Sequence, residues 1–90
     1  MALRMIPDDA QTLALKALGF VAASEGGLDR LMELSGLDLG TLRTKAGEPE
    51  ILASLLDFLL ADEGLLVDFC HQESIDSKEV HMARHVLGGA

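Results

Sequence analysis

The chain has 90 residues, of which 49% are hydrophobic and only 3% aromatic, and its formal net charge is −8. This length fits a single domain, since chains this short seldom divide. The excess of acids disfavours binding to a phosphate backbone, and the absence of Trp and Tyr disfavours stacking on single-stranded bases. The composition predicts a leucine-rich domain and disfavours nucleic acid as a partner.

Three features of the sequence predict a cytoplasmic protein. The single cysteine, Cys70, excludes an internal disulfide and fits a reducing compartment. Pro7 breaks the N-terminal stretch too early for it to provide the apolar core of a secretory signal. No uncharged apolar stretch of about 18 residues is present, so we expect no membrane span and no membrane partner.

The first helix is expected to begin at Pro7-Asp8-Asp9, because proline and acids are favourable at a helix start. It should run to about Ser24, before the turn at Gly26-Gly27. Apolar residues cover so much of its circumference that we expect it to be central or to lie in an interface. Gly19 costs about 1 kcal/mol relative to alanine, so we expect close approach of another helix to compensate there.

Two short helices are expected next, over residues 28–35 and from Asp38 or Gly40 to about Lys45, with Gly36 ending the first of them. Their apolar residues should point inward: Leu28, Leu31, Met32, Leu34, Leu39 and Leu42. Leu31, Leu37 and Leu42 would hold the two helices together.

This pair of short helices resembles a helix-turn-helix, and its second helix would present the only locally basic surface of the chain. The residues presented are Thr41, Arg43, Thr44 and Lys45. Asp29 and Glu33 would face the same DNA, however, and repel its phosphates. A divergent helix-turn-helix DNA-binding regulator using Arg43, Thr44 and Lys45 is therefore the alternative function rather than the preferred one.

The run from Ile51 to Phe69 is strongly apolar, but acids interrupt it at roughly helical spacing. It therefore predicts two helices with buried faces and not a membrane span. The first, over residues 50–61, follows Pro49 and should be the central helix of the domain. Its apolar residues cover over half of the circumference: Ile51, Leu52, Leu55, Leu56, Phe58, Leu59 and Leu60. Ser54 and Asp57 mark its solvated side.

Two further helices complete the chain. After a tight corner at Asp62-Glu63-Gly64, the fifth should run to about Glu73, and the sixth should cover residues 78–87 with Ser77 as its cap. The residues expected to be buried in them are Leu65, Leu66, Phe69, Cys70, Val80, Ala83, Val86 and Leu87. We expect an all-α, compact orthogonal bundle of five to six short helices. Residues 1–7 would form a loose lead-in, and residues 8–90 a single helical domain.

Cys70, His71, His81 and His85 are the residue types that could carry chemistry. The spacing of His81 and His85 can chelate a metal on a helix, but the helical wheel places both toward solvent. Cys70 and His71 diverge by about 100° as helix neighbours, so they do not form a nucleophile and its base. We therefore expect no enzyme activity and no catalytic, cofactor-binding or metal-binding residues.

Several segments occur in an order that resembles a family of short bacterial proteins, common in alphaproteobacteria and described only as a domain of unknown function. They are Ala17-Leu18-Gly19-Phe20, Leu34-Ser35-Gly36-Leu37, Leu42-Arg43, Leu56-Asp57-Phe58-Leu59-Leu60, Asp68-Phe69-Cys70 and a last helix that ends in glycines. The resemblance extends from about residue 8 to residue 89. It implies an all-helical fold in a bacterial cytoplasm, with no activity or site residues to carry over.

The surplus of apolar residues in the first, fourth and fifth helices predicts either a self-buried core or an interface, which composition does not separate. Residues 46–90 hold nine of the 15 acids and two of the seven bases, so such an interface would be framed by negative charge. The candidate positions for self-association are Leu52, Leu56, Leu60 and Leu66. We expect a non-catalytic protein-interaction module or a homodimer, with a protein partner or a second copy as its ligand.

Overall fold

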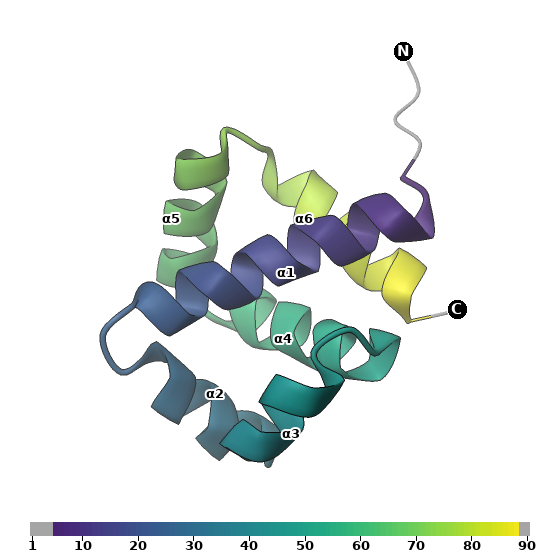
Figure 1. Ribbon diagram of the computed structural model, residues 1–90. Helices are drawn as coiled ribbons and strands as arrows, with labels where there is room; N and C mark the ends of the chain where they lie inside the picture. Colours follow the sequence, from purple (N-terminus) through teal and green to yellow (C-terminus); the bar gives the residue numbers. More distant parts are fainter. Residues whose placement is uncertain (1–4, 89–90) are drawn as a thin grey trace.

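The computed structural model describes residues 5–88, which form six α-helices joined by short turns (Figure 1). The helices are α1 (Pro7–Ala23), α2 (Gly27–Ser35), α3 (Leu39–Lys45), α4 (Pro49–Ala61), α5 (Glu63–Glu73) and α6 (Ser77–Leu87). No strand occurs between residues 5 and 88, which confirms the predicted all-α bundle of short helices. No helix in that range is long and apolar enough to cross a membrane.

The central helix is α4, as predicted, because it packs against α1, α2, α5 and α6 (Figure 1). It contributes the largest group of buried residues: Leu52, Ala53, Leu55, Leu56, Phe58 and Leu59. Each fully buried leucine stabilises the fold by about 1.5–3 kcal/mol relative to an exposed one. The core of the described chain is therefore built outward from α4, and the other helices take their positions from it.

The inner face of α1 is lined by small residues. Ala10, Ala14, Ala17 and Val21 are all completely buried, and α1 packs on both α4 and α6. Alanine at this spacing lets two helices approach closely without the backbone entropy that glycine would cost. Alanines, not Gly19, provide the close approach that we expected along α1.

Gly19 lies on the exposed side of α1, and no atom of another helix lies within 4 Å of the position that its Cβ would take. The expectation that close packing explains this glycine was therefore wrong. Its neighbours on that side, Leu15 and Ala22, are exposed as well. The wide apolar arc of α1 is thus only partly covered by the rest of the described chain.

Two leucines expected to point inward do not. Leu34 is 68% exposed and Leu39 is 43% exposed, although Leu31 and Leu42 of the same two helices are buried. In α2 the buried side is formed by Leu28, Leu31 and Met32, and helical periodicity turns Leu34 away from it. Burial in helices this short is decided by the few residues that reach α1 and α4.

Asp76, and not Ser77, is the N-cap of α6, which corrects the sequence-based assignment. The Lys78 backbone N–H donates to Asp76 Oδ1 at 2.9 Å, and the Asp76 N–H donates to Glu79 Oε2 at 3.0 Å. The Asp76 side chain also accepts from the Glu79 N–H, so Asp76 and Glu79 form a capping box, which needs an acid or amide three residues after the cap. Glu79 meets that spacing from Asp76, so the helix begins one residue earlier than predicted.

Asp62 connects three helices at the α4–α5 corner. It ends α4 and caps α5, where the Leu65 N–H donates to Asp62 Oδ1 at 3.2 Å. Its other oxygen, Oδ2, lies 3.2 Å from Arg30 Nη2 of α2. One acid thus fixes the corner that the sequence predicted and ties it to the neighbouring helix.

Replacing Gly19 with alanine should raise the free energy of unfolding by about 0.5–1 kcal/mol, because the site is open and alanine loses less backbone entropy in a helix. Gly36→Ala is the matched control. Gly36 also has open space around it, but its φ is +76°, so alanine should lower the free energy of unfolding by about 1–2 kcal/mol. Urea denaturation measures the free energy of unfolding of both variants. If Gly19→Ala lowered that free energy, the result would contradict the open, purely helical environment of Gly19.

Candidate functional site

The four leucines proposed as self-association positions divide into two groups. Leu52 is 1% exposed and Leu56 is fully buried, so both belong to the core and cannot form an interface without unfolding it. Leu60 and Leu66 are half-buried. Of the two alternatives left open by the sequence, the self-buried core therefore holds for Leu52 and Leu56, since α1, α2, α5 and α6 cover that face of α4.

An open apolar pocket of about 280 Å³ lies between α1, the end of α5 and α6, and we call it the α1–α6 pocket. Five apolar residues line it: Met5, Leu13, Phe69, Ile75 and Met82. Five polar or charged residues complete its wall: Asp9, Thr12, Lys16, Glu73 and Glu79. Its α1 side runs from Asp9 to Lys16, about two helical turns or 10 Å. This is an open depression on the surface and not an enclosed chamber.

The floor of the α1–α6 pocket combines a fixed aromatic with flexible side chains. Phe69 is fully buried, and its ring packs on Phe20 with the ring centroids 5.5 Å apart and the planes tilted by 59°. Such tilted aromatic contacts add stability beyond simple burial. Met5 and Met82 are half-buried at the pocket and, as unbranched thioethers, adjust to irregular shapes. The pocket therefore has a rigid base and adaptable sides.

The rim of this pocket is acidic. Asp9, Glu73 and Glu79 supply three carboxylates, and Lys16 supplies one ammonium group, which lies 3.6 Å from Glu73 Oε1. Asp9 Oδ2 accepts from the Ile6 N–H at 3.5 Å, and Glu79 takes part in the capping box of α6. A carboxylate can accept several hydrogen bonds, so these backbone contacts leave capacity for a ligand. The pocket thus carries two more negative than positive charges.

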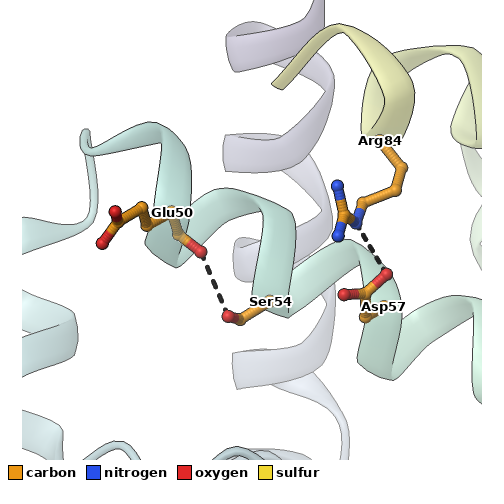
Figure 2. A network of polar contacts seen from close by, with 4 residues as sticks. All are labelled: Glu50, Ser54, Asp57 and Arg84. Atoms are coloured by element: carbon orange, nitrogen blue, oxygen red, sulfur yellow. Dashed lines mark hydrogen bonds and ion pairs between the residues drawn. The ribbon is translucent and has the colours of Figure 1, made fainter. Parts of the chain in front are cut away.

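A second depression follows the exposed strip of α4, and we call it the α4 groove. Ser54 and Asp57 line both of its parts, of about 360 and 250 Å³, which are flanked by Leu34 of α2 and by Leu87 of α6. Figure 2 shows how its polar residues lie: Arg84 Nε donates to Asp57 Oδ1 at 2.7 Å, and Ser54 Oγ donates to the Glu50 carbonyl oxygen at 3.1 Å. The Asp57 hydrogen bond raises the pKa of the Arg84 guanidinium.

The residues of the suspected helix-turn-helix are largely exposed. Arg43, Thr44 and Lys45 lie on the outside of α3, where Thr44 Oγ1 donates to the Gly40 carbonyl oxygen at 2.9 Å. Asp38 caps α3, since its Oδ1 accepts from the Thr41 N–H at 2.7 Å, and this bond lowers the pKa of Asp38. A carboxylate that is charged at neutral pH thus stands at the start of the helix that would approach DNA.

The cysteine and histidines do not converge. Cys70 is buried, while His71, His81 and His85 are all exposed, as the helical wheel predicted. No cluster of three or more His, Cys, Asp or Glu side chains suited to a metal occurs in residues 5–88. Apart from the thiol of Cys70, no ionisable side chain of residues 5–88 is buried, so no carboxylate, amine or imidazole in that range is desolvated. The absence of enzyme activity stays a prediction.

Sequence reasoning missed the acids of the pocket. The sequence pattern predicts only a helix-start role for Asp9 and no role for Glu79, although each stands three residues after a helix cap, at Ile6 and Asp76. The capping-box spacing of Asp76 and Glu79 was a usable local signal. Nothing in the sequence indicates that the starts of α1 and α6 lie beside the end of α5, because that proximity depends on how the helices pack.

The thiol of Cys70 should react slowly in the folded protein. Burial raises the pKa of this thiol, and the negative charges of Asp76 and Glu79 act in the same direction, so less of the reactive thiolate is present at neutral pH. Alkylation by iodoacetamide, followed by mass spectrometry between pH 7 and pH 9, should be slower for the native protein than for the same protein in urea. Faster alkylation of the native protein would instead indicate an activated nucleophile.

Comparison with known proteins identifies a family but no activity. The model of a family described as a protein of unknown function (DUF3572) matches residues 7–90. No curated protein and no solved structure matches the chain. The family resemblance seen in the order of sequence segments is thus confirmed as far as a domain of unknown function is concerned. The match covers nearly the whole chain, and the protein belongs to the DUF3572 family.

Proposed function

We propose that this protein is a non-catalytic interaction module of an alphaproteobacterial cytoplasm, which binds another protein or a second copy of itself through the α1–α6 pocket. The observation that carries the proposal is the combination of an apolar floor with an acidic rim in one surface depression. The floor offers favourable burial to an apolar side chain, and the rim can select among ligands by charge.

The size and shape of the pocket favour a protein ligand over a small molecule. Its volume of about 280 Å³ lies just below the range of roughly 300–1,000 Å³ that is usual for small-molecule sites, which also enclose most of their ligand. An open depression of this size suits one or two bulky side chains of a protein segment that lies over it. The adaptable methionines, Met5 and Met82, are the residue type that protein-binding grooves favour.

The charged groups of the pocket also favour binding over catalysis. Glu73 is paired with Lys16, and Asp9 and Glu79 support the starts of α1 and α6. A general acid or base normally needs a perturbed environment and freedom to exchange a proton with the substrate. These carboxylates serve the fold first, and their remaining role is electrostatic.

Filling the pocket should abolish binding. Thr12 is an exposed residue of the pocket wall, and Thr12→Trp would place a large ring over the apolar floor without disturbing a buried residue. We expect the wild-type protein to retain a reproducible partner from lysate of its source organism, or to form a dimer by light scattering. The Thr12→Trp variant should lose that partner or become monomeric.

Ala22→Trp is the matched control, because Ala22 is an exposed position of the same helix that does not line the pocket. It should retain the partner or the dimer, and circular dichroism should show that both variants keep the wild-type helix content. Equal binding by all three proteins, or the absence of any partner and any dimer with the wild type, would contradict the proposed function.

The alternative is the helix-turn-helix regulator, which the exposure of Arg43, Thr44 and Lys45 favours. The acids Asp29 and Glu33 are exposed on α2, and Asp38 stands at the start of α3, so negative charge surrounds these cations. Since non-specific DNA affinity comes mainly from cations on phosphates, this surface should bind DNA poorly.

We expect no retention of the protein on a duplex-DNA column at low salt, because the net charge of −8 repels the phosphates. The measurement is the elution volume at increasing salt. Salt-sensitive retention that is lost in an Arg43→Ala/Lys45→Ala variant would favour the regulator over the interaction module.

A further inference from the structure

We infer that the ligand of the α1–α6 pocket is a positively charged amphipathic helix of another protein, which inserts a bulky apolar side chain into the pocket and sets Lys or Arg side chains against its acidic rim. This inference rests on the proposed function and specifies the chemistry of the partner. It is carried by the charge of the rim, the shape of the floor and the distribution of acids over the chain.

The charge of the rim determines that the partner should be positively charged. Among residues 5–88, four ionisable side chains line the pocket: Asp9, Glu73 and Glu79 are acids, and the cation Lys16 lies 3.6 Å from Glu73. A Lys or Arg of the partner would therefore meet two carboxylates, Asp9 and Glu79, that form no ion pair within the described part of the chain. An acidic partner would meet the same carboxylates as like charges, which costs binding free energy.

Acidic residues around the pocket also favour a positively charged partner. Asp8 precedes Asp9 on α1, and Asp76 caps α6 beside Glu79, and both of these additional acids are exposed. The whole chain carries a net charge of −8, so the long-range field also attracts a cationic ligand and increases the rate of encounter. Lys78 and His81 are the nearest exposed basic residues along α6, and neither lines the pocket.

One wall of the pocket is helix α1, and a second helix can lie alongside it. The α1 wall is built from Asp9, Thr12 or Leu13, and Lys16, which repeat at helical spacing along about 10 Å. A second helix laid in such a depression presents side chains at three- and four-residue intervals, so its apolar residues can follow the floor while its cations reach the rim. An isolated small cation would satisfy the rim but leave the apolar floor exposed.

The decisive experiment measures the binding of three synthetic peptides of about four helical turns by fluorescence anisotropy. The first is amphipathic with Leu and Phe on one face and Lys and Arg on the other. The second has Glu in place of every cation, and the third has Gln in place of every apolar residue. We expect the wild-type protein to bind the first peptide at least tenfold more tightly than either of the others, with an affinity that falls as salt is raised.

Two charge variants test whether the rim itself selects the ligand. Glu73→Gln/Glu79→Gln removes two rim charges, and glutamine at position 79 can still complete the capping box. Glu25→Gln/Glu33→Gln makes the same change in net charge at exposed positions away from the pocket. The affinity for the first peptide should fall by about tenfold in the rim variant, as expected for two charge pairs of moderate strength. It should fall by less than about twofold in the control variant.

The outcomes separate this inference from the proposed function. The inference that the rim selects a cationic helix would be overturned by either of two results. One is an equal loss of affinity for the first peptide in the rim and control variants, and the other is equal affinity of the wild type for the basic and acidic peptides. If Thr12→Trp still removes a natural partner that the rim variant keeps, the pocket binds proteins but of different chemistry, and the inference fails while the proposed function stands. If Thr12→Trp removes neither peptide nor partner, both fail.

Discussion

The close packing of α1 on α4 and α6 is the contact on which the rest of the structure depends. It is made by Ala10, Ala14, Ala17 and Val21, all fully buried, against the leucine-rich face of α4 and the Val80 and Ala83 side of α6. Small residues on one helix and large residues on the other interdigitate, which gives the density that protein interiors require. A larger residue at Ala14 or Ala17 would force α1 away from both partners.

Several of the acids serve the starts of helices. Asp38, Asp62 and Asp76 each accept a backbone N–H at a helix start, and Asp62 also pairs with Arg30. A chain with short helices has many unsatisfied backbone donors, and Asp caps satisfy them. The negative charge of this protein is thus partly a consequence of how its helices begin, and three further acids, Asp9, Glu73 and Glu79, lie where α1, α5 and α6 meet.

The α1–α6 pocket arises from the same architecture. The starts of α1 and α6 bring Asp9 and Glu79 to its rim, while the end of α5 brings Phe69 to its floor and Glu73 to its rim. Because these groups are held by capping interactions and by core packing, their positions are set before any ligand arrives. A preformed site of this kind loses less conformational entropy on binding than a flexible one.

The sequence by itself determined the helices, because their starts and ends depend on neighbours in the chain. Pro49 begins α4, Gly36 ends α2 and the spacing of leucines in α4 predicts a central helix, all of which the structure contains. Prediction from neighbours in the chain failed where the burial of a residue depends on contacts with helices that are distant in the sequence. Leu34 is exposed, and Gly19 has no helix against it.

Only the tertiary structure decided which apolar faces are covered and which acids gather around an apolar floor. Periodicity shows that a helix has an apolar side, but the area left uncovered depends on the lengths and crossing of the helices that pack on it. Asp9, Glu73 and Glu79 come from three helices and are brought together only by that packing. The candidate site could not be found from the sequence, because its residues are neighbours in space and not along the chain.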